Sequence, residues 1–153
     1  MATQKVLVPY NFTAQEEKTL DFVVGTYANR DDVQITLFNA YTPLPTVDMD
    51  ASPELSKMRG AMASLSSELR EKEAGLKSAK EFLLQNGLRD DQVDYIFKAK
   101  DRSVADEIMD AVSKGHYRVL VLSRQLKVSR LFGRSVHTKV LSSLKDITVC
   151  IVT

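Results

Sequence analysis

Short apolar runs alternate along the chain with longer stretches in which apolar residues recur at helical spacing. The runs predict five strands, at residues 5–10, 33–41, 93–99, 119–122 and 147–152. The stretches between them predict helices that begin near Thr13, Ser52, Ser103 and Ser135. We therefore expect the α/β class: a five-stranded, mostly parallel sheet with helices on both faces.

Local signals set the expected ends of the helices. Thr13 and Glu16 have the spacing of a capping box, in which each side chain bonds the other residue's amide. Pro53 suits the first position of the second helix, Gly87 its C-terminal cap, and Gly115 the end of the third helix. The second helix keeps one apolar row: Leu55, Met58, Met62, Leu65, Leu69, Leu76, Ala79 and Leu83.

Residues 119–140 are the first place to look for ligand chemistry. Ser123 ends an apolar run, and residues 124–134 then contain four basic residues and no acidic one. Ser135 can cap the helix that follows. Ligands of open α/β sheets bind beyond the carboxyl ends of the strands, and helix N-termini attract anions. The alternative is a solvated basic loop with Ser135 as a simple N-cap.

Composition narrows the class of protein. The 153 residues carry a formal net charge of +1, and so small a positive charge does not favour binding to nucleic acid. No apolar stretch reaches the length of a membrane span. Cys150 is the only cysteine, which excludes an intrachain disulfide and a cysteine metal cluster. We expect one cytoplasmic domain over residues 1–153.

The chain resembles the universal stress protein family over nearly its whole length. The resemblance lies in KVLVPYNFT, the proline-containing loop with the long second helix, RVLVLS, SRLFGRSVHTKVL and ITVCIVT. It implies a Rossmann-like sheet with the strand order 3-2-1-4-5 and a homodimer formed through the last strand. Many members of the family bind ATP, and others do not.

The departures from the family pattern concern the ligand site. ATP-binding members have an aspartate after the first strand, where this chain has Asn11, and two glycines where it has Ser123 and Leu126. Glycine lets a backbone approach phosphates, and asparagine cannot accept from two ribose hydroxyls as a carboxylate does. The candidate ligand- or anion-binding residues form a degenerate set: Asn11, Ala40, Ser123, Arg124, Lys127, Arg134, Ser135 and Val136.

These departures favour a dimeric regulatory or binding protein of the stress response without tight ATP binding. The alternative is an ATP-binding member that acts as a nucleotide-dependent switch, with or without slow hydrolysis. We expect no catalytic residue, no metal and no cofactor; ATP or AMP is the candidate if a nucleotide does bind. Residues 148–153 carry no charge that would discourage edge pairing, so Val149, Ile151 and Thr153 are the predicted dimer contacts, and a further protein partner is expected.

Overall fold

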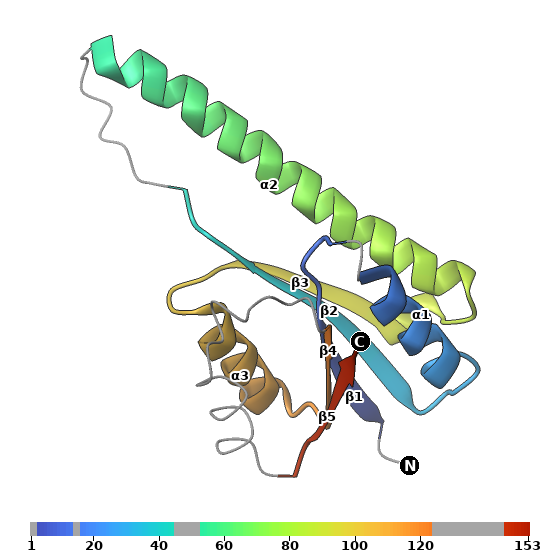
Figure 1. Cartoon of the computed structure of the whole chain (residues 1–153). Helices are drawn as coiled ribbons and strands as arrows, with labels where there is room; N and C mark the ends of the chain where they lie inside the picture. Colours follow the sequence, from blue (N-terminus) through green and yellow to red (C-terminus); the bar gives the residue numbers. More distant parts are fainter. Residues whose placement is uncertain (1–2, 14–15, 45–52, 124–145) are drawn as a thin grey trace.

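A computed structural model describes residues 3–13, 16–44, 53–123 and 146–153, with the backbone alone for residues 53–58. Five strands form one sheet in the order β3-β2-β1-β4-β5 (Figure 1). They are β1 (Gln4–Pro9), β2 (Val33–Tyr41), β3 (Val93–Ala99), β4 (Val119–Ser123) and β5 (Thr148–Val152). Every neighbouring pair is parallel, β5 included. The predicted fold class and strand order are confirmed.

Helices cover both faces of this sheet, as predicted. They are α1 (Glu16–Tyr27), α2 (Pro53–Gln85) and α3 (Val104–Gly115), and a short 3-10 turn, η1 (Asp90–Gln92), precedes β3. One core packs α1 and α2 on side chains such as Val6, Ile35 and Val121. A second core packs α3 on the opposite face, on alternate residues such as Leu7 and Leu120. Burial on both faces explains why β1, β2 and β4 contain nearly continuous apolar runs. The helix expected to begin at Ser135 lies outside the described residues.

The predicted capping box at the start of α1 is wrong, whereas the predicted end of α3 at Gly115 is confirmed. The Glu16 carboxylate accepts from the backbone N–H of Asn11 at 3.2 Å and not from that of Thr13, and Oγ1 of Thr13 has no hydrogen-bond partner within the described residues. Gly115 is the last residue of α3, and His116 takes the left-handed conformation with φ of 55°. A Cβ at Gly115 would overlap the Tyr117 ring, so this glycine is needed for packing.

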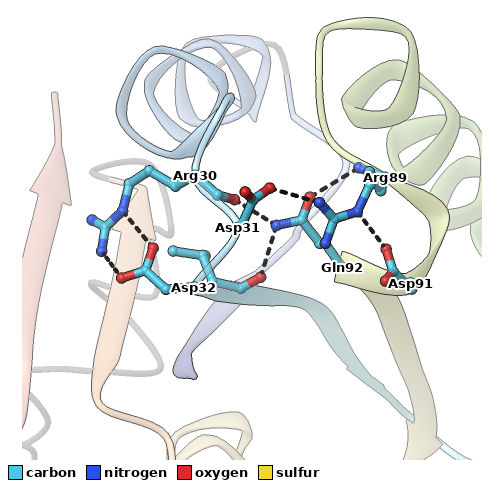
Figure 2. A network of polar contacts seen from close by, with 7 residues as sticks. Arg30, Asp31, Asp32, Arg89, Asp91 and Gln92 are labelled. Carbon is cyan, nitrogen blue, oxygen red and sulfur yellow. Dashed lines mark hydrogen bonds and ion pairs between the residues drawn. The ribbon is translucent and has the colours of Figure 1, made fainter. Parts of the chain in front are cut away.

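The amino ends of β2 and β3 are joined by a polar network (Figure 2). The buried Gln92 amide donates to the carbonyl oxygens of Arg30 at 2.6 Å and Val33 at 3.2 Å. Arg89 donates to Asp31 and to Asp91 at 2.6 and 3.0 Å. These carboxylates lie at the end of the sheet opposite the expected ligand edge. Their role here is to fix the chain where α1 and α2 return to the sheet.

Candidate ligand-binding edge of the sheet

Three adjacent strands bring polar residues to the same level at the carboxyl edge. Pro9 pairs with Phe38, so Tyr10 and Asn39 are the next residues along β1 and β2. Val6 pairs with Val119, and Tyr10 and Ser123 each lie four residues further on. The order of the strands reverses between β1 and β4, and ligands of such sheets bind at that switch point. The fold therefore brings Asn11 and Ser123 to the expected edge.

Two buried polar atoms at this level have no hydrogen-bond partner within the described part of the chain. They are Oδ1 of Asn39 and Oγ of Ser123. The Asn39 amide nitrogen donates to the Tyr10 carbonyl at 2.9 Å, which fixes the side chain beside the end of β1. Buried polar groups are normally paired. Asn39 and Ser123 are therefore the groups at this edge that a small polar ligand could satisfy.

The space beside Asn39 is small. A hollow of about 20 Å³ lies between the ends of β1 and β2 and the start of α3, lined by Pro9, Tyr10, Asn11, Phe38, Asn39, Ala40, Val104 and Ile108. Ligand pockets usually measure several hundred Å³. Ala40, a predicted site residue, lines this hollow but is itself buried. The described residues at the carboxyl edge therefore do not by themselves enclose a space large enough for a nucleotide.

A larger groove of about 510 Å³ runs between α1 and α2. Tyr10, Leu20, Gly75, Ala79 and Phe82 line it, together with Ser78 and two carboxylates, Glu17 and Asp21. Both carboxylates are on exposed residues of α1. Since like charges repel, this groove does not suit a phosphate-bearing ligand. The carboxyl edge therefore remains the candidate anion site.

Glu16 places a carboxyl group directly under the loop that follows β1. Its side chain is fully buried, and Oε2 has no partner among the described residues. Burial raises the pKa of Glu16 to about 7, and the hydrogen bond from the Asn11 amide opposes this shift only in part. Burial and the charges of Glu16 and Glu17 also raise the pKa of Tyr10. Above pH 7 the Glu16 carboxyl group is therefore mainly ionised. Its negative charge lies beneath the loop and occupies the backbone N–H of Asn11.

Glu107 fixes the loop between β3 and α3 on the other side of the edge. Oε1 of this buried residue accepts from the backbone N–H groups of Asp101 and Arg102, and Oε2 pairs with Lys98 at 2.8 Å. The bond from Lys98 lowers the pKa of Glu107 against the effect of burial. Ser103 caps α3 by accepting from the Asp106 amide at 3.1 Å. The apolar wall made by Val104 and Ile108 is held in place by these contacts.

The predicted site residues divide into two groups. The structure places Asn11, exposed, and Ala40 and Ser123, buried, at the carboxyl edge of neighbouring strands. Arg124, Lys127, Arg134, Ser135 and Val136 lie outside the described residues. Sequence reasoning missed Asn39 and gave Glu16 only a capping role. Both carried a signal: Asn39 interrupts an apolar strand, and Glu16 lies on the same helical row as Leu20 and Val23.

Comparison by sequence gives no relative: no protein-family model matches the chain, and no curated protein does. Comparison with solved structures does give matches. A universal stress protein from Archaeoglobus fulgidus in complex with dAMP matches with a TM-score of 0.64 at 15% identity, over 100% of both chains. A universal stress protein in complex with cAMP has a TM-score of 0.60 at 17% identity, over 100% of this chain and 98% of its own.

A universal stress protein family protein from Arabidopsis thaliana with AMP bound has a TM-score of 0.54 at 18% identity, over 97% of this chain and 90% of its own. The chain therefore has the fold of the universal stress proteins, as the resemblance implies. Among the described residues no group of three or more histidine, cysteine or acidic side chains could hold a metal, and no described helix is long and apolar enough to cross a membrane.

Proposed function

We propose that this protein is a single-domain member of the universal stress protein family, a cytoplasmic homodimer that regulates a protein partner by binding it. It catalyses no reaction and does not hold ATP tightly. The fold and its nucleotide-bound neighbours support the family and make an adenine nucleotide the first ligand to test. Residues of this chain itself account for the weak ATP binding.

The Glu16 carboxyl group is the observation that carries this proposal. It takes the Asn11 amide as its own partner, and above pH 7 it adds negative charge beneath the loop at the ligand edge. Asn11 stands where the family pattern has a carboxylate, and a lost charge-assisted hydrogen bond costs about 1.5–3 kcal/mol. Ser123 adds a side chain where glycine would leave room. Because each 1.4 kcal/mol is about tenfold, these changes move a micromolar site toward millimolar.

The first test is whether a nucleotide accompanies the natively purified protein. Mass spectrometry of the supernatant after denaturation should show ATP, AMP and cyclic nucleotides at far below one equivalent per chain. As an internal control for ATP retention, protein is exchanged into buffer with excess ATP, desalted and measured in the same way. Stoichiometric ATP or AMP in the untreated sample would instead support the nucleotide-dependent switch.

The free edge of β5 supports the dimer. Within the described residues β5 pairs only with β4, so one side of the strand is open for a second chain. Ile151 is 50% exposed, and Val149 is partly buried against the α3 core. An exposed, uncharged edge strand favours pairing with another strand. A two-fold arrangement would place β5 antiparallel to its copy, with Val149, Ile151 and Thr153 at the contact.

At tens of micromolar, Ile151→Lys is expected to convert the dimer to a monomer. The substitution places two like charges across the two-fold axis, which costs several kcal/mol and weakens dimerisation by about 100-fold or more. Light scattering coupled to size exclusion measures the change. Asp94→Lys on β3, the other edge strand of the described sheet, is the matched control and should stay dimeric. A wild-type protein that is monomeric at tens of micromolar would contradict the proposed dimer.

A further inference from the structure

Helix α2 is much longer than the surface it covers. Its 33 residues span about 50 Å. Only the C-terminal part is buried in the α1–α2 core, through Leu76, Ala79 and Leu83. The Glu73 carboxylate accepts from the Tyr95 hydroxyl at 3.2 Å, which marks where α2 meets β3. The N-terminal half of α2 projects past the sheet (Figure 1). We refer to residues 59–72 as the α2 arm.

The arm continues the apolar row that the rest of α2 buries. Met62, Leu65 and Leu69 precede Leu76, Ala79 and Leu83 at alternating spacings of three and four residues, with Lys72 at the one polar position. This strict seven-residue repeat is the pattern of helices that pair with another helix. Leu65 is 40% exposed, and neither core of the described residues includes Met62, Leu65 or Leu69. The same row thus has a partner at one end of α2 and lacks one at the other among the described residues.

The charges along the arm indicate what its partner is. Residues 60–67 (GAMASLSS) contain no charged side chain, although most of them are exposed. The nearest charged residues are Arg59 on one side and Glu68 on the other. In an antiparallel copy centred between Ala63 and Ser64, each Arg59 lies level with the partner's Glu68. In a parallel, in-register copy, each Arg59 would lie level with the partner's Arg59, and each Glu68 with the partner's Glu68.

We propose that the α2 arm is a self-association surface that pairs antiparallel with the same arm of a second copy. The centre of the contact packs Met62 against the partner's Leu65, and the small residues around it allow the helices to approach closely. The surface is separate from β5, because α2 covers β2 and β3 at the opposite end of the sheet. Both contacts can form at once, so the protein assembles beyond a dimer at high concentration.

Sedimentation of the full chain in the Ile151→Lys background isolates this surface. Leu65→Asp and Ser67→Asp make a matched pair: both add one aspartate to the arm, but Ser67 lies on the face away from the apolar row. The Ile151→Lys protein should still dimerise reversibly as its concentration rises. Leu65→Asp should weaken that dimer by about tenfold or more, and Ser67→Asp by less than about threefold. Ile151→Lys protein that stays monomeric at millimolar concentration, or equal effects of the two aspartates, would overturn the proposal.

Spin labels test the direction of pairing. With Cys150 replaced by serine, a single cysteine is introduced at Ser67 or at Lys77, both exposed. In the antiparallel arrangement the label-to-label distance grows by about 30 Å between the two positions, since each residue adds 1.5 Å on both helices. In a parallel arrangement it stays nearly constant. Equal distances would therefore contradict the antiparallel pairing even if the arm does associate. Circular dichroism of each variant confirms that it remains folded.

Discussion

Glu107→Ala is expected to lower the free energy of unfolding by about 2–4 kcal/mol at pH 7, which is a large part of the stability of an ordinary domain. The buried carboxylate binds Lys98 and the amides of Asp101 and Arg102, and in the alanine variant these three groups lose their carboxylate partner. The loss falls below the upper end for a buried pair because Lys98 is 40% exposed and regains water. Urea unfolding measures the change.

The pH dependence of this loss separates charge from packing. Lys98 lowers the pKa of Glu107 in the folded protein, so the carboxylate stabilises the fold above its unfolded pKa and this contribution disappears as pH falls. The difference between wild type and Glu107→Ala should therefore be full at pH 7 and shrink toward pH 3. Asp110→Ala, which removes a more exposed carboxylate from the same helix, should cost less than about 0.5 kcal/mol. A constant deficit across this range would show that Glu107 acts by packing alone.

Glu16→Gln is expected to stabilise the protein at pH 8 by roughly 2–3 kcal/mol relative to wild type. Burial raises the folded pKa of Glu16 to about 7, from 4.5 in the unfolded chain. The folded protein then binds more protons than the unfolded chain between pH 4.5 and 7, so wild-type stability falls as pH rises through this window. Glutamine resembles the protonated acid and can still accept from the Asn11 amide. Unfolding curves at several pH values measure the difference.

Glu17→Gln provides the control for Glu16→Gln, since Glu17 is the adjacent, exposed carboxylate of α1. It should change the unfolding free energy little and without a step between pH 4.5 and 7. The difference between Glu16→Gln and wild type should be near zero at pH 4 and reach its full size above pH 7. A Glu16→Gln protein that is less stable than wild type at pH 8 would mean that the ionised carboxylate is accommodated.

The strands were predictable because both faces of a parallel sheet are buried. Val6, Leu7, Ile35, Leu37 and Val119 to Val121 are buried to 97% or more, as the continuous apolar runs predict. The ends of the helices were less predictable from the sequence. The sequence predicts that α3 ends at Gly115, but it does not predict the left-handed conformation of His116 or the packing of the Tyr117 ring beside Gly115. That ring is a tertiary contact, which local sequence signals do not contain.

The candidate site was predictable only in its location. The order of elements brings Asn11 and Ser123 to one edge, since the fold fixes where strands end. The hydrogen bond from the Asn11 amide to Glu16 was not predictable, because a capping box and a buried acid share the same short sequence. Asn39 acquires its role from a neighbouring strand, through the Tyr10 carbonyl. Such pairings depend on register across the sheet.

Titration calorimetry with ATP tests the central claim, a stress-protein fold without tight nucleotide binding. At physiological salt the wild type should show no saturable binding below about millimolar ATP. Weak binding that appears only at low salt would belong to the basic residues of 124–134, since exposed charges are screened within about 8–10 Å. Micromolar affinity that survives physiological salt and is lost in Asn11→Ala or Ser135→Ala would contradict the claim and make the protein a nucleotide-dependent switch.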